Sequence, residues 1–158
     1  MAEAAAASWL LLECLQERVQ GITRAAGFMT DLGTGPVVLD DDTLDDDTPG
    51  TVIQAGLISV TSSSGSAVNF DMDITVEFSV KRDSAAGAQH GVQQMHRCLL
   101  DLARALLFKD LRELPRFVRT FEQTGAQLAT GDDERGATYL VAQVTARAGL
   151  TQIHQPAT

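Results

Sequence analysis

The stretch Phe70-Asp71-Met72-Asp73-Ile74-Thr75-Val76-Glu77-Phe78-Ser79-Val80 alternates strictly between apolar and polar side chains. Successive side chains of a β-strand point to opposite faces of a sheet, so this pattern predicts a strand with one buried face and one wet face. Half-buried strands of this kind are typical of antiparallel sheets. The fold prediction therefore starts from a sheet that contains residues 70–80.

Two segments with helical periodicity lie on either side of this strand. Steps of three and four between apolar residues predict an amphipathic helix over residues 3–26, which Gly27 would end in a left-handed conformation. Its apolar stripe is Leu12, Leu15, Val19, Ile22 and Ala26. The same spacing predicts a second helix over residues 85–108. Its apolar face is Val92, Met95, Leu99, Leu102 and Leu106.

The remaining segments predict further strands and a closing hairpin. Residues 36–39, 51–61, 117–130 and 138–150 read as extended chain, and residues 62–66 as a flexible connection. Strands in runs between two helices favour an α/β fold of the α+β kind: a mostly antiparallel sheet with two helices packed on one face. Residues 1–150 are predicted to form a single domain, and residues 151–158 a flexible C-terminal tail.

Composition excludes several classes of protein. The 158 residues are 44% hydrophobic and 21% charged, which is typical of one folded globular domain. A net charge of −9 argues against nucleic-acid binding, since phosphate affinity depends on lysine and arginine. There is no apolar run of about 18–20 residues that would cross a bilayer. The first 12 residues also lack the basic start of a secretory signal, so we expect a cytosolic protein without a membrane partner.

Clustered carboxylates are the strongest candidates for a metal site. In the acidic run of residues 40–47, a calcium-binding loop started at Asp45 would place Pro49 at its fifth position and Gly56 where the bidentate glutamate belongs. We expect a solvated loop there. Asp71, Asp73 and Glu77 share the wet face of one strand. Apart from Ser79, no histidine, cysteine or serine lies near them in sequence to complete a site. We expect them to be exposed or to contact another subunit.

Other reactive side chains do not form a recognisable constellation. His90 and His96 are six residues apart on a predicted helix, a spacing that points them to different faces, and no hydrolase or dinucleotide motif occurs. Cys14 and Cys98 lie at helical core spacings, so we expect buried, reduced thiols. The sequence thus predicts a protein that is not an enzyme, with no catalytic residue, cofactor or metal ion.

Four features in chain order resemble a known family. The first is a helix ending in Ala26-Gly27-Phe28, and the second is an acidic loop before an apolar strand, Asp45-Asp46-Asp47-Thr48-Pro49-Gly50-Thr51-Val52-Ile53. The third is the alternating strand 70–80, and the fourth is the acidic turn Asp132-Asp133-Glu134-Arg135-Gly136-Ala137-Thr138-Tyr139. In element order and loop character, residues 10–150 resemble the tail terminator proteins of long-tailed, lambda-like siphophages. The chain departs from that pattern in its length, in the serine-rich residues 62–66 and in the residues after 150.

The resemblance implies a subunit of a homo-hexameric ring that caps the phage tail tube and ends its polymerisation. The expected partners are further copies of the chain, the tail tube protein and the head-tail connector protein. DNA would pass through the ring without specific binding, which suits an acidic channel wall. The protein would be a structural part of the virion, at the head-proximal end of the tail, assembled in the host bacterial cytoplasm.

Three alternatives remain open at this point. Another head-tail connector or minor tail protein would share these features, and ring size and choice of partner would distinguish it. A small acidic metal-dependent hydrolase would need residues 40–47, or Asp71, Asp73 and Glu77, to close around an ion. A cytosolic adaptor would be monomeric and would have a groove in place of a ring.

Charge is distributed unevenly along the chain. Residues 1–80 hold two basic and thirteen acidic residues, a net charge of −11, whereas residues 81–158 hold ten basic and eight acidic residues, a net charge of +2. Opposite charges on two surfaces of one subunit would steer and register a head-to-tail ring. The candidate contacts are Asp45, Asp46, Asp47, Lys109, Arg112, Arg116 and Arg119. Solvated charge without a contact role is the competing interpretation.

Overall fold

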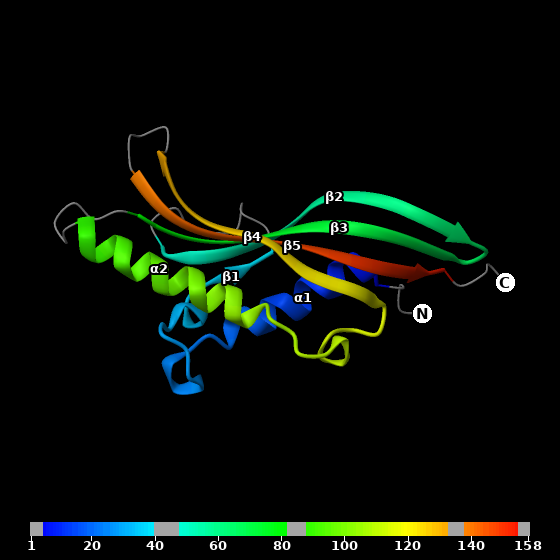
Figure 1. The fold of residues 1–158 in the computed structure, drawn as a ribbon, viewed down its shortest axis with the longest axis horizontal. Helices are drawn as coiled ribbons and strands as arrows, with labels where there is room; N and C mark the ends of the chain where they lie inside the picture. The colour runs from blue at the N-terminus through cyan, green and yellow to red at the C-terminus, as the bar shows by residue number, and fades with distance from the viewer. Residues whose placement is uncertain (1–4, 40–47, 82–87, 133–137, 155–158) are drawn as a thin grey trace.

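The computed structural model describes residues 5–39, 48–81, 88–132 and 138–154 (Figure 1). The helices and strands are α1 (Ala7–Gln20), β1 (Val37–Val38), β2 (Gly50–Ser64), β3 (Ala67–Lys81), α2 (Ala88–Ala105), β4 (Val118–Asp132) and β5 (Thr138–Ile153). Three short 3-10 turns are η1 (Arg24–Ala26), η2 (Leu32–Thr34) and η4 (Leu111–Glu113).

The strands form one five-stranded sheet in the order β1-β2-β3-β5-β4. The short strand β1 is parallel to β2, and every other neighbouring pair is antiparallel. Both helices lie on the same face of the sheet (Figure 1). The predicted α+β fold, with a mostly antiparallel sheet and two helices on one face, is therefore confirmed.

The core lies between the helices and the apolar face of the central strands. On β3, the predicted alternation is confirmed, because Met72, Ile74 and Val76 are at most 1% exposed. Leu15 of α1 and Leu102 of α2 are fully buried in the same cluster. Burying a side chain of this size contributes about 1.5–3 kcal/mol, so these contacts are the main source of stability.

The first helix is shorter than predicted. It ends at Gln20 and not at residue 26, and the chain then forms η1, in which the Thr23 hydroxyl accepts a hydrogen bond from the Ala26 amide at 3.2 Å. A threonine that caps a new turn competes with continuation of the helix. Gly27 does adopt the predicted left-handed conformation, with φ of 95°, but it ends η1 and leaves Ala26 exposed.

The apolar face of α2 is rotated relative to the prediction. Cys98 is 2% exposed and belongs to the core, whereas Leu99 is only partly buried and Val92 is 42% exposed. The buried positions are Met95, Cys98, Leu102, Ala105 and Leu106. Leucines at both 99 and 100 made the face ambiguous from periodicity alone, and packing against the sheet selects the Cys98 side.

Two segments predicted to be flexible belong to the sheet. Residues 62–64 pair with β3, and the hairpin turn is confined to Gly65 and Ser66, where Gly65 has φ of 58°. Strand β5 continues to Ile153, which pairs with Ala67, so the first three residues of the predicted tail are strand. In both cases β3 begins early enough to supply backbone partners. Residues 155–158 lie outside the described part of the chain.

Candidate functional site

The sheet face opposite the helices is polar, and no described helix covers it (Figure 1). We call it the polar face. Strand alternation and register assign to it the side chains of Asp71, Asp73, Thr75, Glu77, Glu122, Gln127, Gln143, Thr145 and Arg147. Cross-strand hydrogen bonds join some of them, including Gln127 to Gln143 at 2.7 Å. These hydrogen bonds connect side chains on a sheet face that no described helix covers.

The charge of the polar face is negative. It holds the carboxylates of Asp71, Asp73, Glu77 and Glu122. Two guanidinium groups oppose them: Arg147 pairs with Asp71 at 3.5 Å, and Arg119 lies beside Gly149, close to the position that a Cβ there would take. The alternation of β3 also places Lys81 on this face, so four negative and three positive side chains leave it with a small net negative charge.

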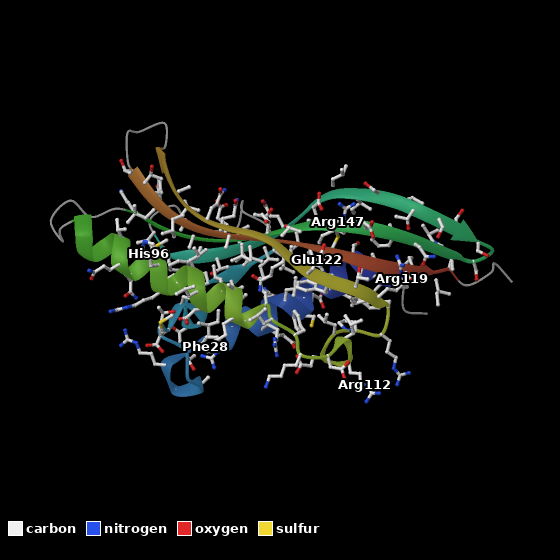
Figure 2. All side chains as sticks on the ribbon, viewed as in Figure 1. Phe28, His96, Arg112, Arg119, Glu122 and Arg147 are labelled. Carbon is white, nitrogen blue, oxygen red and sulfur yellow. The ribbon has the colours of Figure 1, made fainter. Side chains whose placement is uncertain are left out.

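The four basic residues predicted to form one group lie at two different places in the structure. Lys109, Arg112 and Arg116 are exposed around η4. Arg112 lies on the helix side of the molecule (Figure 2). Arg112 forms an ion pair with Asp110 at 3.8 Å, although its side chain is 92% exposed. Arg119 lies apart from them, at the polar face, where it donates a hydrogen bond to the Leu150 carbonyl oxygen at 3.4 Å. Its inclusion in one basic group was therefore wrong.

The acidic partners predicted for this group cannot be placed. Asp45, Asp46 and Asp47 lie outside the described residues. By sequence they belong to the connection between β1 and β2, which form one end of the sheet order, whereas η4 leads into β4 at the other end. The described strands that flank residues 40–47 and the strand that follows η4 thus lie at opposite ends of the sheet order.

Both edges of the sheet are largely open in the described chain. On one edge, β1 pairs with β2 only at Thr51 and Val52, so β2 has no further strand partner on that side from Ile53 to Ser64. On the other edge, β4 pairs with β5 alone. Each open edge presents unpaired backbone N–H and C=O groups that can add a strand.

The distal part of β2 also exposes apolar side chains. Leu57, Ile58 and Val60 are 70%, 48% and 67% exposed, next to an irregularity between Ala55 and Ile58. These side chains lie on the edge strand β2, and only the far end of the β2–β3 hairpin extends past the helices (Figure 1). Trp9 of α1, 48% exposed, lines a shallow groove of about 470 Å³ beside Ala55. Clustered exposed apolar side chains are typical of interaction surfaces.

A second apolar groove lies near the opposite edge. Its volume is about 360 Å³, and its lining includes Val92 and Met95 of α2 and Leu128 of β4. This groove explains why Val92 is exposed, because α2 and β4 diverge at this end of the sheet. The position of the groove beside β4 adds an apolar element to the second edge.

Neither cysteine lies in an environment that favours the reactive thiolate. Burial, with a smaller contribution from the Asp101 carboxylate, raises the pKa of Cys98 to about 11, which disfavours the nucleophilic thiolate. The pKa of Cys14 is also raised, mainly by burial, although this side chain is half-buried and not buried as predicted. Both cysteines are free.

Asp101 is a buried carboxylate that the sequence analysis did not single out. It is 1% exposed and accepts hydrogen bonds from the Met29 amide at 3.1 Å, the Thr30 amide at 2.8 Å and the Thr30 hydroxyl at 2.6 Å. It therefore anchors the segment after η1 to α2. An aspartate next to the apolar stripe of a helix was the available signal.

Within the described residues, no group of three or more histidine, cysteine, aspartate or glutamate side chains is arranged to hold a metal ion. His96 and His154 are exposed, and the side chain of His90 is outside the described set. None of the described helices is both long and apolar enough to cross a membrane. Comparison with protein-family models gives no match, and comparison with curated proteins gives none.

Proposed function

We propose that the chain is a structural subunit of a closed ring, most simply of six copies, that caps the tail tube of a long-tailed phage. In this role it ends tube polymerisation and offers a surface to the head-tail connector protein. It acts through contacts and not through catalysis. The observation on which the proposal rests most is a sheet with two different open edges and an uncovered acidic face.

The two edges supply the contacts of a ring. A closed ring needs two different surfaces on each subunit, because each copy binds its neighbour head to tail. One edge consists of β2 with exposed Leu57 and Val60, and the other of β4 beside the basic residues of η4. These surfaces differ in sequence and charge, which favours a heterologous contact over a two-fold dimer.

The polar face suits the wall of a channel. With the helices on the wider, outer side of a ring, the opposite sheet face turns toward the axis. Its carboxylates, such as Asp73 and Glu77, outnumber its cations, so a DNA backbone would pass without adhering. The acidic face and the head-to-tail edges together support the resemblance to tail terminators.

Light scattering and negative-stain microscopy test the proposal. The purified chain, alone or with the tail tube protein of the same phage, is expected to form a ring with a mass near 101 kDa, which is six times 16.9 kDa. Tube ends should carry this ring and stop growing. A particle of 16.9 kDa at high concentration, with and without the tube protein, would contradict the proposal.

The same experiment distinguishes the alternatives. A ring that binds the connector but leaves tube growth unchanged would indicate another head-tail connector protein. For the metal-dependent hydrolase, calorimetry with calcium, magnesium and manganese is decisive, because a tight, saturable site in residues 40–47 would favour that class. We expect only weak heats that salt abolishes.

A further inference from the structure

The open edges lack some of the features that protect edge strands and carry others. Natural edges are often short or carry lysine, proline or inward-pointing charge, which prevents pairing with other chains. Strand β2 has 15 residues, Gly50–Ser64, and none of them is charged or proline. Strand β4 also has 15 residues, Val118–Asp132, without lysine or proline, although it holds Arg119, Glu122 and Asp132. Each of the two strands has two β-bulges, and the stretches between the bulges stay open to pairing. Such edges are stable in solution when another strand covers them.

The strand directions allow the two edges to pair with each other. β2 is antiparallel to β3, β3 to β5, and β5 to β4, so β2 and β4 run in opposite directions within one subunit. Consider a second copy that is related to the first by rotation about an axis parallel to the strands. Its polar face is on the same side of the sheet as that of the first copy. The second copy then brings its β2 antiparallel to the first subunit's β4, which is the favourable geometry for a continuous sheet.

At both open edges, backbone N–H groups point away from the sheet, where a further strand can accept hydrogen bonds from them. Thr51 donates its backbone N–H to the Pro36 carbonyl oxygen at 2.9 Å, away from β3. On β3, Phe78 lies opposite Thr51 and Phe70 lies opposite Val60. Phe70 and Phe78 are an even number of residues apart, so the N–H of Val60 points away from β3, as that of Thr51 does. The same alternation, followed through β5, directs the N–H of Ala126 to the open side of β4.

Charge favours contact between unlike edges over contact between like edges. On the helix side near β1 and β2, exposed Glu13 and Glu17 line a groove beside Leu39. On the helix side of β4, the segment around η4 exposes three cations, Lys109, Arg112 and Arg116, and two carboxylates, Asp110 and Glu113, so its net charge is +1. A two-fold contact between identical edges would bring like charges together, whereas a head-to-tail contact brings these groups to the same junction.

We infer that β2 of one copy pairs antiparallel with β4 of the next, through the open stretch of β2 from Ile53 to Ser64. The occupant of each open edge is thus a second copy of this chain, and one sheet runs around the ring. This inference rests on the proposed function, since it specifies the contact that closes the ring. The mode is strand addition, in which backbone hydrogen bonds supply the affinity.

Two proline variants test the contact. Val60→Pro removes an outward backbone donor from β2 and Ala126→Pro one from β4, and neither donor faces the strand that pairs with it among the described residues. Each variant alone is expected to remain at 16.9 kDa in light scattering. An equimolar mixture should form a dimer near 34 kDa, twice the chain mass, because one intact edge of each kind remains. That dimer cannot extend further.

Other results would overturn the inference in distinguishable ways. A dimer of either variant alone would mean that identical edges pair. Wild-type mass in both variants would mean that the ring uses other surfaces, which leaves the proposed function intact. A wild-type chain that stays monomeric with the tube protein removes the ring and this contact together.

Matched substitutions guard against misfolding of the proline variants. Val60→Lys and Ala126→Lys place a charge at the same two edges and should give the same masses and the same mixed dimer. Leu100→Lys, at an α2 side chain that is 59% exposed, should leave the ring unchanged. Far-ultraviolet circular dichroism of every variant should match the wild type. Loss of the ring in Leu100→Lys as well would contradict an edge-specific contact.

Discussion

The two faces of the sheet differ in chemistry although they are built from the same strands. On β3, Met72 and Ile74 are at most 1% exposed, while Asp73 between them points to solvent. The covered face joins both helices to the sheet and determines stability. The polar face and the open edges contribute little to folding of one subunit. Substitutions on the two sides should therefore separate stability from assembly.

The largest expected difference in stability is between substitutions of two neighbouring residues on β3. Met72→Ala should lower the free energy of unfolding by about 2–5 kcal/mol, because it leaves a cavity in the core. Asp73→Ala, one residue away on the polar face, should change it by no more than about 0.5 kcal/mol. Urea unfolding at one fixed protein concentration measures both, since assembly itself stabilises the fold. Equal losses in the two variants would contradict the difference between the faces.

A second effect on stability is expected at Asp101, the buried carboxylate of α2. Asp101→Ala should lower the free energy of unfolding by about 1–3 kcal/mol, because the buried donors of Thr30 and the part-buried amide of Met29 lose their acceptor. Hydrogen exchange of those two amides should become faster, while exchange in β3 is unchanged. Asp73→Ala serves as the exposed carboxylate control. Unchanged exchange at both amides would show that the anchor is dispensable.

Charge at the second edge should affect assembly more than folding. Arg112→Glu combined with Arg116→Glu should slow ring formation at low salt, and high salt should slow the wild type similarly. The urea midpoint of unfolding should not change, since exposed ion pairs contribute little. The control is Arg24→Glu with Arg97→Glu, which alters total charge equally. Assembly at the wild-type rate in the first double variant, at low and high salt, would eliminate this steering.

The smallest effect is in thiol chemistry. Since the pKa of Cys98 is raised to about 11, its thiolate is rare at pH 8, and iodoacetamide should label Cys98 more slowly than half-buried Cys14. The folded pKa lies above the ordinary value of 9.0, so the stability that this thiol contributes is complete below pH 9 and is lost as pH rises toward 11. Mass spectrometry of labelled peptides gives the two rates. Faster labelling of Cys98 would mean that α2 presents the opposite face.

Patterns along one element were predictable, whereas choices made by packing were not. Strict alternation over residues 70–80 predicted which side chains of β3 are buried, and helical spacing predicted that Leu15 and Leu102 are in the core. The sequence predicted both Cys98 and Leu99 to be buried, whereas the structure buries Cys98 and leaves Leu99 partly exposed. That choice depends on the angle at which α2 crosses the sheet.

The candidate surfaces were predictable in part. The basic residues at 109, 112 and 116 are exposed as a group, but Arg119 follows the strand geometry of β4 to the other face. The open edges required the sheet order, since a strand's position in a sheet is a non-local property. The lack of charge in β2 was visible in the sequence, and it becomes meaningful only for an edge.

A cryo-electron microscopy map of the assembled particle tests the central claim most directly. The predicted result is a closed ring, most simply of six copies, whose channel is lined by the polar face with Asp73 and Glu77. Helices α1 and α2 should lie on the outer side, as their common position on one sheet face requires (Figure 1). A monomer, an open filament, or a ring with the helices turned toward the axis would contradict it.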